Sequence, residues 1–168
     1  EIWNFRTEQS FIKSQRKLSL IIQNGLVVFI DTFGDVSALD INSGNLVWQS
    51  QTINEDIFES SFLLKNSRLV SDGDTIFVSN NKNKFFAIDL RNGSIKWEQT
   101  INSYLESTII ENLVFSVSRE GYLFILDKSN GNILRSTKLF YIEKDKKIYP
   151  TGFIVVKNYI YISLNNGR

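Results

Sequence analysis

The 168-residue chain contains no cysteine, no histidine and no methionine, and only one proline. Without cysteine it can form neither a disulfide nor a thiolate metal site. Without histidine it lacks the commonest general base, the usual metal ligand and the partner that activates a serine or cysteine nucleophile. Carboxylate, lysine and tyrosine side chains remain available for chemistry. The composition therefore favours a function in binding over one in catalysis.

Charge is balanced along the chain, and no apolar run is long. There are 19 basic and 18 acidic residues, which gives a formal net charge of +1. So close a balance creates no field that would gather nucleic acid or acidic lipid, and we expect neither as a partner. Hydrophobic residues make up 42% of the chain. No run approaches the roughly 18 apolar residues of a membrane span, so we expect a globular fold without a transmembrane span.

One stretch of sequence occurs three times along the chain. Each copy has an apolar run, an Asp, a short polar turn that reaches a Gly, and a second run in which apolar residues follow one polar residue. The turn glycines are Gly44, Gly93 and Gly131, at intervals of 49 residues (44 to 93) and 38 residues (93 to 131). Similarity at such intervals is typical of an array of supersecondary units. The copies are Gly34–Trp48, Lys84–Trp97 and Gly121–Arg135.

Each copy predicts a β-hairpin. In the first copy the run Val36–Leu39 ends in Asp40, and the turn 42–44 separates it from a second run, Asn45–Trp48. Glycine allows the positive φ that such a turn needs, and Asp accepts hydrogen bonds from the turn backbone. The aspartates could instead be catalytic or bind a metal, but catalysis does not need three copies. The predicted turns are 42–44, 91–93 and 129–131, each preceded by Asp40, Asp89 or Asp127.

These hairpins resemble the repeat of the PQQ-like β-propeller family, whose core reads approximately A-x-D-x-x-T-G-x-x-x-W. In the first copy Ala38, Asp40, Gly44 and Trp48 match that core. Trp3 resembles the end of an earlier copy, because it lies 45 residues before Trp48. The second copy matches through Ala87, Asp89, Gly93 and Trp97, and the third through Asp127 and Gly131, with Ile125 and Arg135 departing from the pattern.

The resemblance implies an all-β fold, a β-propeller built from four-stranded antiparallel blades. We expect about three complete blades plus parts of two more, belonging to a ring of about seven or eight blades. A closed ring of about four blades is the less favoured alternative. The inner strand of the second complete blade is expected to start at Ser61. The expected divisions are an outer strand at 1–7, blades at 18–52, 61–100 and 107–139, and the start of a further blade at 151–168.

The tryptophans Trp3, Trp48 and Trp97 fall on the expected outer strands. In another protein such rings could stack on a sugar or a quinone. Their spacing of one blade indicates instead that each fills the gap between one sheet and the next, where an aromatic ring buries a large apolar surface. The aspartates, glycines and tryptophans of the repeat are therefore expected to hold the fold together.

The resemblance leaves three functions open. The family includes scaffolds of the outer-membrane assembly (BamB) type, quinone-dependent dehydrogenases and sensor domains. We expect a non-enzymatic protein-interaction scaffold of the BamB type, which would work in the periplasm and bind neither a cofactor nor a metal through this chain. The alternatives are a fragment of a PQQ-dependent dehydrogenase and the ligand-sensing propeller domain of a receptor.

The expected contacts are protein partners, or the remaining blades of the same protein. In a propeller, the loops after the second and fourth strands emerge on one face, and loops on a rigid scaffold commonly carry function. Here they contain aromatic residues of the kind that anchors interfaces. Self-association through open propeller edges is a further expectation, since unpaired edges oppose solubility. The candidate anchors are Phe58, Tyr104, Phe140 and Tyr141.

Overall fold

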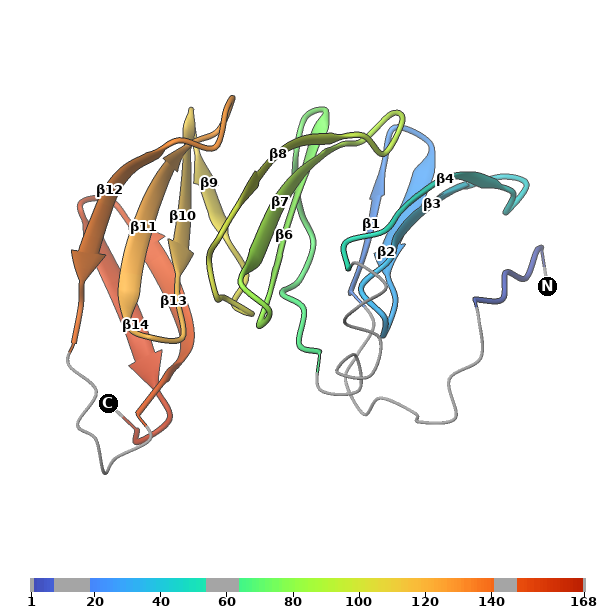
Figure 1. Ribbon diagram of the computed structural model, residues 1–168. Coiled ribbons are helices and arrows are strands. Elements are labelled where there is room, and N and C mark those ends of the chain that lie inside the picture. Colours follow the sequence, from blue (N-terminus) through green and yellow to red (C-terminus); the bar gives the residue numbers. More distant parts are fainter. Residues whose placement is uncertain (1, 8–18, 54–63, 141–147, 168) are drawn as a thin grey trace.

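The computed structural model describes residues 2–7, 19–53, 64–140 and 148–167. Within these ranges the chain forms fourteen β-strands and no helix. The strands make three four-stranded sheets and one two-stranded sheet, each built from consecutive antiparallel strands. The sheets stand side by side in chain order, like the blades of a propeller (Figure 1). The predicted all-β fold with four-stranded blades is confirmed.

Each complete blade uses its strands in sequence order, from one edge of the sheet to the other. Blade 1 consists of β1 (Ser19–Gln23), β2 (Leu26–Ile30), β3 (Val36–Asp40) and β4 (Leu46–Ser50). Blade 2 consists of β5 (Val70–Asp72), β6 (Thr75–Asn80), β7 (Lys84–Asp89) and β8 (Ile95–Gln99). Blade 3 consists of β9 (Thr108–Ile110), β10 (Leu113–Val117), β11 (Tyr122–Asp127) and β12 (Ile133–Lys138). Blade 4 contains β13 (Pro150–Val156) and β14 (Tyr159–Leu164).

The second strands of blades 1 and 2 are buried on both of their faces. In β6 every residue after Thr75 is buried, and in β2 every residue after Leu26. Successive side chains of a strand point to opposite faces. Accordingly Ile76 and Val78 join the apolar core between blades 1 and 2, whereas Phe77 joins the core between blades 2 and 3. A strand with such neighbours needs apolar residues on both faces, and its sequence shows no alternation.

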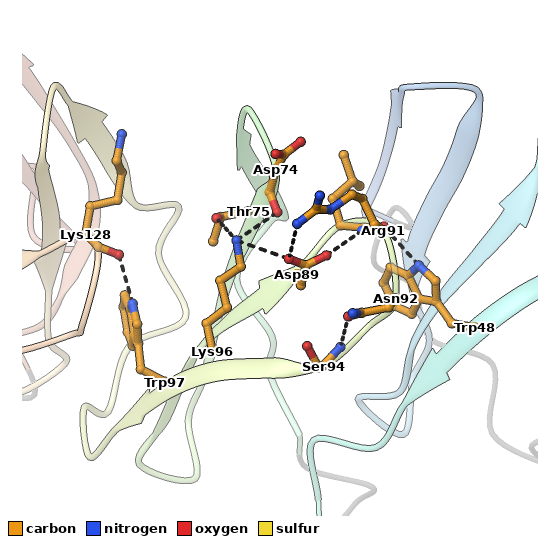
Figure 2. A network of polar contacts seen from close by, with 11 residues as sticks. Trp48, Asp74, Thr75, Asp89, Arg91, Asn92, Ser94, Lys96, Trp97 and Lys128 are labelled. Carbon is orange, nitrogen blue, oxygen red and sulfur yellow. Dashed lines mark hydrogen bonds and ion pairs between the residues drawn. The ribbon is translucent and has the colours of Figure 1, made fainter.

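The outer-strand tryptophans of blades 1 and 2, Trp48 and Trp97, dock on the hairpin turn of the next blade (Figure 2). The indole N–H of Trp48 donates a hydrogen bond to the carbonyl of Leu90 at 2.9 Å. The ring of Trp48 lies on Gly93, where a Cβ would come within 2.5 Å of the ring atom Cε3. The same 2.9 Å hydrogen bond and ring-on-glycine contact join Trp3 to Ile41 and Gly44, and Trp97 to Lys128 and Gly131.

Two constraints therefore require glycine at the same position of the turn. The first is steric, because the indole ring leaves no room for a side chain. The second is conformational, because Gly93 has a φ of 74°, in the left-handed region that side chains disfavour. This conformation lets the N–H of Gly93 donate to the carbonyl of Asp89 at 2.9 Å. Gly44 and Gly131 have φ values of 71° and 75°.

Residues 2–7 differ from the expected outer strand, because they form no strand. Side chains hold the segment in place: Trp3 docks on the turn of blade 1, and the ring of Phe5 meets that of Phe29 edge-on at 6.0 Å. A strand is defined by its ladder with a neighbour, and among the described strands none pairs with residues 2–7. Trp3 thus contacts the turn of blade 1, whereas the predicted strand over residues 2–7 is not present.

The inner strand of blade 2 also differs from expectation. It was expected from Ser61, which lies outside the described residues, but the described ladder begins only at Val70. Before that point Asn66 forms an isolated bridge with Asn80, and the N–H of Ser67 donates to the carbonyl of Ser79 at 2.8 Å. These polar contacts across the end of β6 replace a regular ladder.

Substitution of the turn glycine tests how much the docked ring adds to the conformational constraint. We expect Gly93→Ala to lower the free energy of unfolding by roughly 3 kcal/mol, because Cβ would combine a positive φ with overlap of the indole of Trp48. Gly73→Ala in the same blade is the matched control. Its φ is 59° and its Cβ would meet nothing within 4 Å. There we expect a loss of about 1 kcal/mol.

Urea denaturation of the two variants beside the unsubstituted chain gives both values. Equal losses at the two positions would contradict the role assigned to the tryptophan.

Candidate protein-interaction face

One end of the blades, which we call the loop face, gathers two kinds of connection. The loops between second and third strands are 31–35, 81–83 and 118–121. The connections from an outer strand to the next blade are described at 51–53, 64–69, 100–107, 139–140 and 148–149. The opposite end, which we call the turn face, carries the tight turns, including the hairpin turns that receive the tryptophans.

Backbone hydrogen bonds tie the two kinds of connection together. The N–H of Asn81 donates to the carbonyl of Lys65 at 3.0 Å, and that of Arg119 donates to the carbonyl of Asn102 at 2.9 Å. The end of each outer strand is fixed as well. For example, the hydroxyl of Thr52 donates to the carbonyl of Gly34. The loop face is therefore a bonded surface and not a set of independent loops.

A polar residue at the end of each second strand closes the loop that follows, and sequence reasoning missed it. The side chain of Asp31 accepts the N–H groups of Phe33 at 2.8 Å and Asp35 at 2.9 Å. Asn80 accepts those of Lys82 at 2.9 Å and Lys84 at 3.3 Å. The signal was a polar residue directly after the buried apolar strand. Ser118 occupies the same place in blade 3 and accepts the N–H of Tyr122 at 3.4 Å.

Two of the four predicted anchors lie in the described part of the loop face. Tyr104 is half-buried, and its ring packs against the core between blades 3 and 4. The ammonium group of Lys65 lies 5.7 Å from the centre of that ring, so the connections before blades 2 and 3 meet at Tyr104. Part of the ring and an exposed lysine remain at the surface. Phe58 and Tyr141 lie outside the described residues.

Phe140 has a neighbour within the chain. It is half-buried, and its ring covers Gly121, where a Cβ would come within 2.8 Å of the ring atom Cε2. Gly121 has a φ of 81°. On the loop face, Phe140 thus repeats the aromatic-on-glycine contact that the tryptophans make on the turn face. Part of the Phe140 ring is therefore already engaged within the chain.

The repeated aspartates lie on the turn face and are occupied by their own turns. Asp40 accepts the N–H of Ser43 at 2.7 Å and its hydroxyl at 2.8 Å, which lowers the pKa of the carboxyl group. The pKa of Asp127 is lowered in the same way, by the side chain and the backbone of Ser129. Hydrogen bonds to the charged form favour ionisation. These carboxylates therefore serve as acceptors within the turns.

Asp89 has the most elaborate surroundings of the three (Figure 2). Its side chain is only 8% exposed, and burial alone would oppose its charge. The side chain and the N–H of Arg91 and the ammonium group of Lys96 outweigh burial and lower its pKa to about 2. The carboxylate oxygen lies 3.4 Å from each of the two cationic side chains. Lys96 also donates to the hydroxyl of Thr75 at 2.8 Å, which joins the outer strand to the second strand.

The described residues offer no chemical centre beside these turns. In the ranges that the structure covers, no group of three or more acidic side chains is placed to hold a metal ion. No helix there is long and apolar enough to cross a membrane.

Comparison with known proteins gives one family. The family model described as outer membrane protein assembly factor BamB matches residues 1–137. The uncharacterised protein RP232 of Rickettsia prowazekii (strain Madrid E) is 21% identical over 99% of this chain and 41% of its own length. BamB of Salmonella typhimurium (strain LT2) is 25% identical over 71% of this chain and 28% of its own length. The chain thus spans less than half of the curated relatives that it matches.

Solved structures share the fold. The crystal structure of BamB from Moraxella catarrhalis superimposes with a TM-score of 0.65 at 17% identity, over 88% of this chain and 46% of that chain. Quinohemoprotein alcohol dehydrogenase from Comamonas testosteroni superimposes with a TM-score of 0.57 at 14% identity, over 71% of this chain and 20% of that chain. At such identities the likeness shows the β-propeller fold alone.

The lowered pKa of Asp89 predicts how stability depends on pH. Its pKa falls from 3.8 to about 2 on folding, so its contribution is complete above about pH 4 and is lost as the pH falls through 2. We expect Asp89→Asn to cost about 2 kcal/mol at neutral pH, and the difference from the unsubstituted chain to vanish toward pH 2.

Urea denaturation across the pH range measures this difference. Glu106→Gln is the control, because Glu106 pairs with Arg68 at 3.7 Å while more than half of each side chain is exposed. Such a pair contributes less than about 1 kcal/mol. A cost at Asp89 that stays constant with pH would contradict the electrostatic origin of the effect.

Proposed function

The chain belongs to the family of the outer membrane protein assembly factor BamB. We propose that it is a non-enzymatic scaffold that holds protein partners during outer-membrane protein assembly. The place of action would be the periplasm. The observation that carries the proposal is the loop face, whose loops are bonded to one another and leave aromatic surface uncovered. A scaffold needs such a preformed surface, because rigid partners lose less entropy on binding.

The partner surface would centre on Tyr104 and Lys65. An aromatic ring that is partly buried keeps one orientation, and interfaces favour aromatic residues of this kind as anchors. Lys65 lies over the ring and adds a positive charge at the surface. Around them the exposed Arg68 and Glu106 form a rim of mixed charge. This arrangement of an aromatic centre and a polar rim is the usual anatomy of a protein interface.

A genetic test addresses the proposal directly. Deletion of the gene in its bacterium should lower the content of outer-membrane proteins, and the unsubstituted gene should restore it. We expect Lys65→Glu combined with Tyr104→Ser to restore it incompletely, since loss of an interface anchor weakens binding by roughly tenfold or more. The variant protein must be present at the same level as the unsubstituted protein.

Lys157→Glu is the control, because Lys157 is exposed and lies in the turn 157–158 on the turn face, away from the loop face. It should restore the outer-membrane proteins fully. Two results together would contradict the scaffold and favour a PQQ-dependent dehydrogenase. One is an unchanged content of outer-membrane proteins after deletion, and the other is calcium-dependent uptake of a quinone by the protein.

The outward faces of blades 1 and 4 supply a second kind of contact. Tyr159, Ile154 and Tyr161 on one face of blade 4 are 68%, 57% and 58% exposed. At the other end of the array Leu20 and Ile22 in β1 are 51% and 62% exposed. Apolar sheet faces of this kind oppose solubility unless they are covered. We propose that further blades of the protein cover them, or that a second copy does so when this chain is alone.

Sedimentation of the isolated chain at micromolar concentration tests that contact. We expect self-association, because the end faces of separate copies would cover one another. Tyr161→Lys should shift the population toward monomer, since it would place a charge in the contact. A monomer of high thermal stability without any substitution would contradict the proposal.

A further inference from the structure

Three buried serines face one another between blades 2 and 3. Ser79 is 1% exposed, Ser107 4% and Ser116 0%. Ser79 lies two residues after Phe77, and Ser116 two residues after Val114; both of those residues belong to the core between blades 2 and 3. Side chains two residues apart on a strand share a face. The two serines therefore point into this gap, from opposite sides.

Ser107 points into the same gap. The register of β9 on β10 pairs Thr108 with Phe115, so its continuation sets Ser107 opposite Ser116. Opposite residues of antiparallel strands have Cβ atoms about 5 Å apart. Ile109, two residues after Ser107, packs against the core between blades 2 and 3. All three hydroxyl groups thus belong to one interface.

None of the three hydroxyl groups has a hydrogen-bond partner among the described residues. A buried hydroxyl without a partner costs about 1 to 3 kcal/mol, and native proteins contain few of them. Three other buried serines, Ser67, Ser103 and Ser118, have hydrogen-bond partners. The hydroxyl of Ser103, for example, which is 1% exposed, donates to the carbonyl of Val117 at 2.8 Å. Three unpaired hydroxyls in one interface therefore require an explanation.

The neighbouring interface shows that these positions do not have to be polar. By strand register, the residues equivalent to Ser79, Ser107 and Ser116 between blades 1 and 2 are Ile30, Leu69 and Val78. All three belong to a single apolar cluster. The repeat is thus compatible with a dry apolar interface at this place. Blade 2 and blade 3 carry hydroxyl groups there instead.

Larger aromatic rings nearby account for part of this replacement of apolar residues by serines. Phe77 and Phe85 occupy the positions at which blade 1 has Val28 and Val36. The larger rings fill space that becomes available because serine is smaller than the isoleucine, leucine and valine of the neighbouring interface. Alanine would release that space equally well and without a buried hydroxyl. The volume of the rings therefore explains why the residues are small, and leaves unexplained why they are polar.

We propose that Ser79, Ser107 and Ser116 form an internal binding site for water between blades 2 and 3. A buried water molecule typically makes about three hydrogen bonds to polar groups that would otherwise be unsatisfied. Three hydroxyl groups, two from blade 3 and one from blade 2, supply that number. The bound water then joins two blades by hydrogen bonds at a place where blades 1 and 2 rely on apolar contact.

A high-resolution crystal structure of the chain is the direct test. We expect a solvent oxygen within hydrogen-bond distance of the hydroxyls of Ser79, Ser107 and Ser116. An interface that contains no solvent density, with the hydroxyl groups turned toward the aromatic rings, would overturn the proposal.

Stability measurements give an independent test that needs no crystal. In the water-bound interface, Ser116→Ala removes one partner of the water, so the urea midpoint should fall. In a dry interface the same change removes an unsatisfied hydroxyl group, so the urea midpoint should rise. A rise would therefore overturn the proposal. Ser103→Ala, which removes a paired hydroxyl, calibrates the fall expected for a single lost hydrogen bond. If Ser116→Ala does not fold, Ser79→Ala provides the same comparison from the other blade.

Discussion

The array depends on the contact between an indole ring and the glycine of the next hairpin turn. Blades 1, 2 and 3 each present the backbone of a tight turn, and Trp3, Trp48 and Trp97 cover these turns and donate one hydrogen bond to each. Neither partner is effective alone, because the ring needs a surface without side chains and the turn needs a positive φ. Glycine meets both needs. The contact links blades one after another, as expected of repeat architectures, in which each unit contacts its neighbours.

The repeat could be recognised in the sequence because its features are local. Turn chemistry requires Asp and Gly at fixed offsets, and Trp48 and Trp97 follow their glycines at one spacing. These constraints predict the hairpins and the all-β fold. The closing role of Asp31 and Asn80 was not predicted, because a polar residue after a strand is compatible with any loop. Phe140 was read as a partner anchor, and its contact with Gly121 depends on a loop that is distant in sequence.

Residues 2–7 show the limit of such inference most clearly. The position of Trp3 followed from the spacing of the repeat, because docking requires only that one ring lies at one position relative to the turn. A strand, in contrast, depends on a neighbour that offers a free edge in register. The sequence of one segment contains no information on whether that neighbour is present. Docking and strand formation are thus separate properties of the same residues, and only docking can be read from a motif.

The turn face and the loop face of the array have different roles. On the turn face the carboxylates, glycines and tryptophans are occupied by one another, so variation there would disrupt the stacking of blades. The interior between blades tolerates change, since Ile30, Leu69 and Val78 give way to three serines one interface further on without altering the strand order. The loop face is bonded through backbone groups, so a change of an exposed side chain such as Lys65 leaves those bonds in place. A propeller of this kind can therefore change its partner by changing loop side chains, while the turns on the opposite face keep the blades in place.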